Sequence, residues 1–315
     1  MKTKLGVAVT VIVLLLTTLY LTLPNAFLAK YLIAIDRHIA GMSKHKLKLD
    51  ELDIAYLRGG SGEPLILLHG FGADKDNWNK VSYYLTDYYD VIAVDIPGFG
   101  DSTRSPTLNY DVTSQIERVK GILVALNIDN AHFAGSSMGG YIAGNFAAQY
   151  PQQVKSLWLI SPFGVTGTQK SDMELAIEQG QQPTILPRTQ QEFNQLFESL
   201  FVTPPFIPQP IIDHLATKAI AAIPLNNKIY QQIHRIKHHQ IHPDLPLNQT
   251  LLGYQSSVLI SWGTEDKILH VSGAKALHQA MPQAQIQIIK DAGHLPMMEM
   301  PAQSARAYLS FTAAQ

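Results

Sequence analysis

Residues 131–139 have the sequence AHFAGSSMG, and residues 140–148 continue it as GYIAGNFAA. The first part is apolar enough for a buried strand, and the second has the composition of a helix. Between them the G-x-S-x-G spacing sets Ser137 on a sharp turn, where the residues two before and two after it must be small so that strand and helix can approach. This stretch therefore predicts a strand, a strained turn and a helix, with Ser137 as a nucleophile. Ser136, one residue earlier, would point away from the tip of the turn.

Other short apolar runs precede and follow this stretch, at residues 65–68, 91–94, 157–160, 258–260 and 286–289. Near-continuous apolar runs are typical of strands that are buried on both faces. Helical stretches lie between them, and in the clearest one Val112, Ile116, Val119 and Leu123 share a face behind a capping residue, Asp111. This alternation predicts an α/β fold, with a mostly parallel central sheet and helices on both of its faces.

One long segment, residues 163–250, interrupts the alternation. It has no buried-strand signal, and it is rich in Pro, Gln, Ile, Leu and Phe. Its apolar content argues against disorder, so we interpret it as a helical cap inserted between two strands. The core then consists of two parts, residues 49–162 and residues 251–315.

A nucleophilic serine needs a base, and the base needs an orienting acid. Asp266 follows the predicted strand 258–260, and His294 follows the next one, so the chain order is serine, acid, histidine. That order is typical of a serine nucleophile on this kind of sheet. Glu265 is a competitor for the acid, while Asp291 is too close in sequence to His294 to support it from across the site. We expect Ser137, Asp266 and His294 to be the catalytic residues.

An acyl-transfer site also needs two donors for the developing oxyanion. Met138, as the residue after the nucleophile, supplies one backbone N–H. The loop HGFG at residues 69–72 follows an early strand, and we assign the second donor to the backbone N–H of Phe71. Phe71 and Met138 are also the predicted substrate-binding residues, whereas Trp78 is expected to be a packing residue.

Composition excludes several other kinds of chemistry. The chain has no cysteine, which rules out thiolate catalysis and cysteine zinc sites. A net charge of −1, from 24 basic and 25 acidic residues, gives no basic excess for binding nucleic acid. His234, His238, His239 and His242 lie within nine residues, but no glutamate follows His234 as a zinc motif would require. We interpret this cluster as polar cap surface, and we expect neither a metal nor a cofactor.

The N-terminal segment is long and apolar. Leu5–Leu23 contains no charged residue and is long enough to cross a bilayer as a helix. A cleavable signal peptide is the alternative, although its apolar run would be shorter and would end at a small-residue cleavage site. We assign residues 1–27 to a single-pass membrane anchor. Lys2 and Lys4 before the run favour a catalytic domain on the non-cytoplasmic, periplasmic side.

Residues 28–48 follow as an amphipathic connector. Leu28, Tyr31 or Leu32, Ile35, Ile39 and Met42 recur at three- and four-residue steps. Such a helix lies either in the membrane interface or against the globular domain.

Several motifs together resemble the α/β-hydrolase superfamily, over about residues 50–310. They are residues 69–72 (HGFG), 95–102 (DIPGFGDS), 135–139 (GSSMG), 263–266 (GTED) and 293–294 (GH). More narrowly, the segments 70–72 and 75–78, the segment 136–140 and the N-terminal anchor resemble membrane-anchored monoacylglycerol lipases and related bacterial lipases. The resemblance implies hydrolysis of carboxylic esters without a cofactor, on lipid esters such as monoacylglycerols or short-to-medium-chain acylglycerols.

Two alternatives remain open at this point. The same residues can hydrolyse another acyl bond, such as a thioester, an amide or a C–C bond of a diketone, because the fold does not fix the substrate. A non-catalytic binding protein on the same fold is the second alternative, although such a protein typically lacks one of the three catalytic residues.

Overall fold

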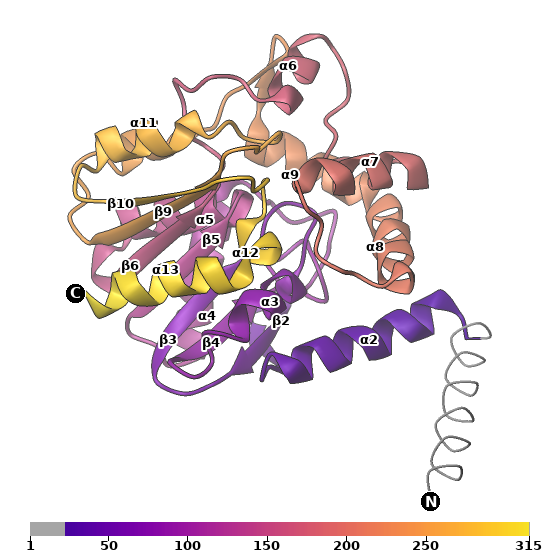
Figure 1. The fold of residues 1–315 in the computed structure, drawn as a ribbon, viewed down its shortest axis with the longest axis horizontal. Coiled ribbons are helices and arrows are strands. Elements are labelled where there is room, and N and C mark those ends of the chain that lie inside the picture. Colours follow the sequence, from indigo (N-terminus) through magenta and orange to yellow (C-terminus); the bar gives the residue numbers. More distant parts are fainter. Residues whose placement is uncertain (1–22, 315) are drawn as a thin grey trace, which may run out of the picture.

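The structure is a computed structural model that describes residues 23–314. In this part of the chain a sheet of eight strands has the order β1-β2-β4-β3-β5-β6-β9-β10 (Figure 1). Its strands are β1 (Ser43–Leu49), β2 (Leu52–Gly59), β3 (Glu63–Leu68), β4 (Tyr89–Val94), β5 (Ala131–Ser136), β6 (Val154–Ile160), β9 (Ser257–Gly263) and β10 (Gln285–Ile289). β2 is antiparallel to both of its neighbours, and the remaining pairs are parallel. The predicted α/β fold with a mostly parallel sheet is confirmed.

Helices cover both faces of the sheet (Figure 1). One face carries α4 (Val112–Ala125), α5 (Met138–Gln149), α10 (Leu247–Thr250) and α11 (Ser272–Ala280). The other carries α3 (Asn79–Ser82), α12 (Pro296–Glu299) and α13 (Pro301–Ala313), and two short 3-10 turns span Lys75–Trp78 and Pro151–Gln153. As predicted, Asp111 caps α4, because its carboxylate accepts the Ser114 backbone N–H at 2.9 Å.

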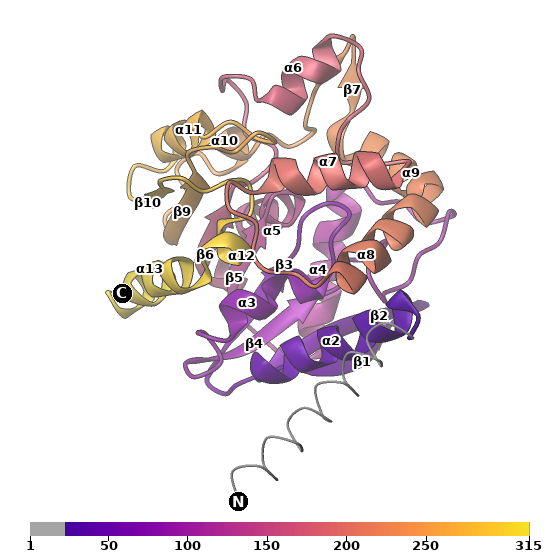
Figure 2. The same cartoon turned by 45° about the vertical axis from the view of Figure 1, so that its right-hand side comes forward.

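The chain leaves the sheet between β6 and β9. Four helices follow β6, namely α6 (Asp172–Glu178), α7 (Gln190–Leu200), α8 (Gln209–Ala221) and α9 (Ile223–His234). A hairpin of two very short strands, β7 (Ile236–Lys237) and β8 (Gln240–Ile241), comes next. These helices gather at one end of the sheet, and Figure 2 shows α7 and α8 side by side there. We refer to residues 163–250 as the cap.

The start of the described chain differs from the expected connector. α2 spans Asn25–Ile39, but residues 43–48, which we assigned to the connector, form the edge strand β1. In β1 the lysines at 44, 46 and 48 are exposed, and only Leu47 and Leu49 in its second half are partly buried. A charged edge of this kind also discourages pairing with another sheet. The predicted connector is therefore helical only up to Ile39, and its last residues belong to the sheet.

No helix within residues 23–314 is long and apolar enough to cross a membrane. The predicted anchor, residues 1–27, lies almost entirely outside the described residues. α2 packs against α8 and places Phe27, Tyr31, Ile35 and Ile39 on its outer side, each at least 44% exposed.

Candidate active site

Ser137 lies at the turn between β5 and α5, with φ 53° and ψ −118°. This region of backbone space is rarely adopted by a residue with a side chain. Two glycines make the turn possible. A Cβ on Gly135 would lie 2.3 Å from the Gly139 carbonyl oxygen, and one on Gly139 would lie 2.0 Å from that of Leu68. The sequence motif is thus a steric requirement of the turn.

Backbone hydrogen bonds fix the turn to the end of β6. The Ser137 N–H donates to the Ile160 carbonyl at 3.0 Å. The Ser137 carbonyl accepts the N–H of Phe163 at 3.0 Å, just after that strand. The hydroxyl-bearing Cβ is therefore held at the carboxyl end of the sheet, where the first turn of α5 begins.

Asp266 and His294, which lie 28 residues apart in the sequence, meet in space. His294 Nδ1 lies 2.8 Å from Asp266 Oδ2, and both residues are buried. The same carboxylate accepts Trp262 Nε1–H at 3.0 Å, and its other oxygen accepts the N–H groups of Ile268 and Leu269 at 2.9 Å. Because four donors surround it, the carboxylate has one orientation, and it fixes the Nδ1 side of the imidazole.

The loop that holds His294 is joined to the end of α7. The His294 backbone N–H donates to the Leu200 carbonyl at 2.8 Å. The neighbouring Gly293 N–H donates to Glu299 at 2.8 Å, and a Cβ on Gly293 would lie 2.5 Å from the same Leu200 oxygen. The histidine loop and the cap therefore share a contact that requires glycine.

The loop after β3 supplies the second predicted donor. His69 is fully buried at the start of this loop, and its ring connects the loop to the segment that follows β4. Nε2 accepts the Ile96 N–H at 3.0 Å, so Nδ1 carries the proton and donates to the Gly70 carbonyl at 2.8 Å. Burial lowers the pKa of His69, consistent with this neutral form. Within residues 23–314 neither the Phe71 N–H nor the Met138 N–H donates to a protein acceptor.

A cavity of about 180 Å³ joins several of these groups. Ser137, His294 and Phe71 line it, whereas Met138, the first residue of α5, does not, because its side chain is buried in the hydrophobic core. Asp266 lies behind His294, outside the lining. Most of the wall is apolar, and α7 contributes Phe193, Leu196, Phe197 and Leu200.

The histidine cluster of the cap divides into two groups. His238, His239 and His242 are exposed around the short hairpin, as predicted. His234 is not surface, because it is 3% exposed at the end of α9 and lines the same cavity as Ser137. Helical spacing contains a signal for this, since His234 lies four residues after Tyr230 and continues the apolar face that Ile229 and Ile233 also form. Among residues 23–314 no three His, Asp or Glu side chains form a group that could hold a metal ion.

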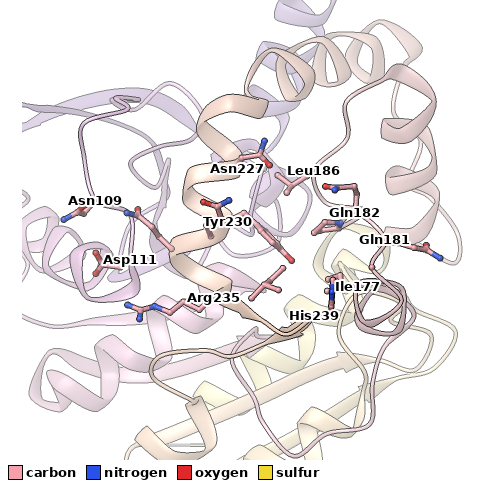
Figure 3. Close-up of a pocket in the computed structure, with 15 residues that line it drawn as sticks. Asn109, Asp111, Ile177, Gln181, Gln182, Leu186, Asn227, Tyr230, Arg235 and His239 are labelled. Atoms are coloured by element: carbon pink, nitrogen blue, oxygen red, sulfur yellow. The ribbon is translucent and has the colours of Figure 1, made fainter.

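A second, larger hollow of about 770 Å³ lies on the other side of α9 (Figure 3). Tyr230 projects into it from α9, and Asn109, Asp111, Gln181, Gln182 and Arg235 are among the polar residues around it. Neither Ser137 nor His294 lines this hollow. The predicted catalytic residues Ser137 and His294 line the smaller of the two cavities.

Known proteins share this fold and sequence. Residues 63–204 match the family described as alpha/beta hydrolase fold. The chain is 31% identical over 255 residues to lipase 3 of Moraxella sp. strain TA144, covering 80% of this chain and 78% of the relative. It is 28% identical over 291 residues to monoacylglycerol lipase ABHD6 of Homo sapiens, covering 88% and 84% of the two chains. The crystal structure of a membrane phospholipase A, described as a bacterial virulence factor, is 36% identical with a TM-score of 0.86, covering 100% of this chain and 99% of that one.

The chain therefore belongs to the α/β-hydrolase fold family, and the resemblance seen in its motifs is confirmed. Within that family it is an ester hydrolase, similar to bacterial lipases and to monoacylglycerol lipases.

Proposed function

We propose that this protein hydrolyses lipid esters, such as monoacylglycerols or short-to-medium-chain acylglycerols, through an acyl-enzyme on Ser137. The observation that supports this most is the arrangement around one apolar cavity. Its wall includes the strained Ser137, and also His294, whose Nδ1 is held by Asp266 at 2.8 Å. A serine nucleophile, a base and an orienting acid are the parts that acyl transfer requires.

The mechanism follows from these positions. Ser137 Oγ attacks the ester carbonyl carbon while its proton moves to Nε2 of His294. The tetrahedral intermediate then breaks its bond to the alcohol oxygen, which takes the proton from His294. Water repeats the cycle on the acyl-enzyme and releases the fatty acid. Asp266 keeps the proton of the resting imidazole on Nδ1, so that Nε2 can act as the base.

Two backbone donors stabilise the negative charge on the intermediate. They are the N–H groups of Phe71 and Met138, which make no hydrogen bond with the protein within the described part of the chain. Met138 is the first residue of α5, where the helix dipole also favours negative charge. The neutral His69 holds the Phe71 loop through its bonds to Gly70 and Ile96.

The acyl chain of the substrate binds against α7. Phe193, Leu196, Phe197 and Leu200 give the cavity a continuous apolar wall beside the nucleophile. Burial of methylene groups against such a wall contributes about 0.8 kcal/mol for each group. Residues 163–250 act in this proposal as a lid over the core formed by residues 49–162 and 251–315.

We also propose that the protein works at a membrane surface. In this proposal the uncharged run of residues 5–23 forms a single-pass anchor that ends before α2, so residues 25–27 of the predicted anchor belong to α2, and the catalytic domain lies on the periplasmic side. The outer side of α2 supports this, because Phe27, Tyr31, Ile35 and Ile39 expose apolar surface at regular four-residue steps next to the anchor. A stripe of this kind suits the interface between lipid headgroups and acyl chains.

Turnover of glyceryl monoesters and of p-nitrophenyl esters with increasing chain length tests the function. We expect hydrolysis of both classes, and labelling of Ser137 by a fluorophosphonate probe. Ser137→Ala should abolish both. No turnover of any ester by the folded wild-type protein would refute the proposal.

A further inference from the structure

His234 is the one histidine of the cap cluster that faces the reaction centre. It is 3% exposed and lines the cavity that contains Ser137. Its ring centre lies 4.4 Å from that of Phe163 and 5.8 Å from that of Phe71. The backbone of Phe163 bonds to Ser137, and Phe71 lies in the proposed oxyanion loop. His234 therefore packs directly against Phe163, which bonds to the nucleophile, and against Phe71, which belongs to the proposed oxyanion site.

One ring nitrogen of His234 is already engaged. Nδ1 lies 3.2 Å from the Tyr230 carbonyl, one helical turn earlier. A carbonyl oxygen can only accept, so Nδ1 carries a proton and donates it. In a neutral ring Nε2 then has a free lone pair and is an acceptor. Within residues 23–314 no donor reaches this nitrogen.

The ring is neutral under all ordinary conditions. Burial among Phe71, Phe163 and Tyr230 lowers the pKa of His234 to about 3. The ring stacks on Tyr230 at 4.1 Å between centres, and no carboxylate offsets the cost of charging it. The imidazole therefore presents an acceptor, and not a cation, to whatever enters the cavity.

We propose that Nε2 of His234 accepts a hydrogen bond from a free hydroxyl group on the alcohol part of the substrate ester. This inference rests on the proposed function and assigns a specificity-determining residue to it. A neutral glycerol headgroup offers such a donor beside the ester bond. A phosphodiester group placed at the same position offers only acceptor oxygens at neutral pH, and it cannot donate to the lone pair of His234.

We assign His234 to the alcohol part of the ester, and not to its acyl chain, because different elements line the cavity on its two sides. α7 lines one wall of the cavity with apolar side chains suited to the acyl chain, whereas His234 comes from α9. A buried acceptor that stays unpaired costs binding free energy, so an ester without a hydroxyl binds less well.

A matched pair of substrates tests the proposal in the full-length protein. Glyceryl monooctanoate and propyl octanoate have the same acyl chain and the same three-carbon alcohol, and they differ only in two hydroxyl groups. We expect wild type to have the higher kcat/KM for the glyceryl ester. In His234→Phe, which keeps an aromatic ring without an acceptor, we expect the ratio of the two kcat/KM values to fall about 10-fold. His234→Gln, which restores an acceptor, should recover part of that ratio.

Tyr230→Phe is the control, because it removes a buried hydroxyl from the same helix and keeps the ring that stacks on His234. Its ratio should equal that of wild type, and the wild-type ratio should not change between about pH 5 and pH 8. An equal loss on both esters in a folded His234→Phe would mean a packing role and would overturn the proposal. If wild type hydrolyses the two esters with equal kcat/KM, the role of His234 is refuted and the proposed function is not. If wild type hydrolyses neither ester, the proposed function is refuted as well.

Discussion

The backbone conformation of Ser137 is possible only because glycines stand two residues before and two residues after it. Its positive φ costs about 1–3 kcal/mol, which the surrounding structure must offset. Gly139 is the more restricted neighbour, because its missing Cβ would lie 2.0 Å from a backbone oxygen that cannot move independently.

Gly139→Ala should lower the free energy of unfolding by about 2–4 kcal/mol, because strand β3 and helix α5 must separate to admit the methyl group. Chemical denaturation followed by circular dichroism measures this. Gly253→Ala is a suitable control. Gly253 has φ 74° but open space around it, so only the backbone cost of about 1–2 kcal/mol applies. Equal losses in the two variants would contradict the steric explanation.

The carboxylate of Asp266 determines which nitrogen of His294 carries the proton. In Asp266→Asn the amide nitrogen can face Nδ1 of His294, which would then carry its proton on Nε2 and could not act as a base. We expect kcat to fall about 10⁴-fold. Stability should also fall, by about 1–3 kcal/mol, because the amide nitrogen then faces the buried Trp262 Nε1–H, which loses an acceptor. Asp291→Asn, an exposed carboxylate three residues before His294, should keep full activity. Ester hydrolysis at saturating substrate compares the two, and similar activity in both would refute the assignment.

Among single residues, the sequence reveals those that have a local steric or chain-order signature. Gly135, Ser137 and Gly139 belong to one short motif, and Asp266 and His294 follow strands in a fixed order. His234 belongs to no motif of this kind, and its only signal is that it continues the apolar face of α9 formed by Ile229, Tyr230 and Ile233. The interpretation of its cluster as surface was therefore wrong at this position and right for its three exposed neighbours.

At the scale of elements, one side chain reinforces the contact between the cap and the histidine loop, beside the backbone bond from His294 to Leu200. Glu299 in α12 accepts the N–H groups of Val202 and Thr203 with one oxygen and that of Gly293 with the other. Water can reach the exposed Val202 and Thr203, but the buried Gly293 N–H needs this acceptor, and a glutamine offers only one oxygen.

Glu299→Gln should therefore lower the free energy of unfolding by about 1–3 kcal/mol and reduce kcat, because the amide nitrogen will face at least one N–H group. Thermal unfolding and ester hydrolysis measure the two effects. Glu265→Gln is the matched control, since Glu265 is exposed and its carboxylate makes no hydrogen bond or ion pair within residues 23–314. If both variants behave like wild type, Glu299 does not join the cap to the loop.

Strands with an apolar run could be predicted, and those without one could not. The runs at 65–68, 91–94 and 258–260 lie inside β3, β4 and β9. β1 was missed because lysines occupy alternate positions, and its strand character comes from pairing with β2. Within the cap the sequence predicted helices without their bounds, because many Pro residues divide it into short segments.

At the scale of the whole molecule, α2 should position the catalytic domain on a lipid surface. Trp78, Trp158 and Trp262 are all buried, so an added tryptophan would report on its own surroundings. Ile35→Trp should shift its fluorescence to shorter wavelength when phosphatidylcholine vesicles are added, because the ring enters the interface. Leu252→Trp, at a site 72% exposed and distant in sequence from α2, should show no shift. If the vesicles change the emission wavelength of both variants equally, or of neither, α2 does not lie in the lipid interface.

The hydrogen bond from the His294 backbone N–H to the Leu200 carbonyl has a further consequence. That amide proton can exchange with solvent only when the end of α7 separates from the loop. Its deuterium uptake therefore measures how often the enzyme opens, without any substrate present. If opening limits the release of fatty acid, exchange at this one amide and turnover will change together with temperature.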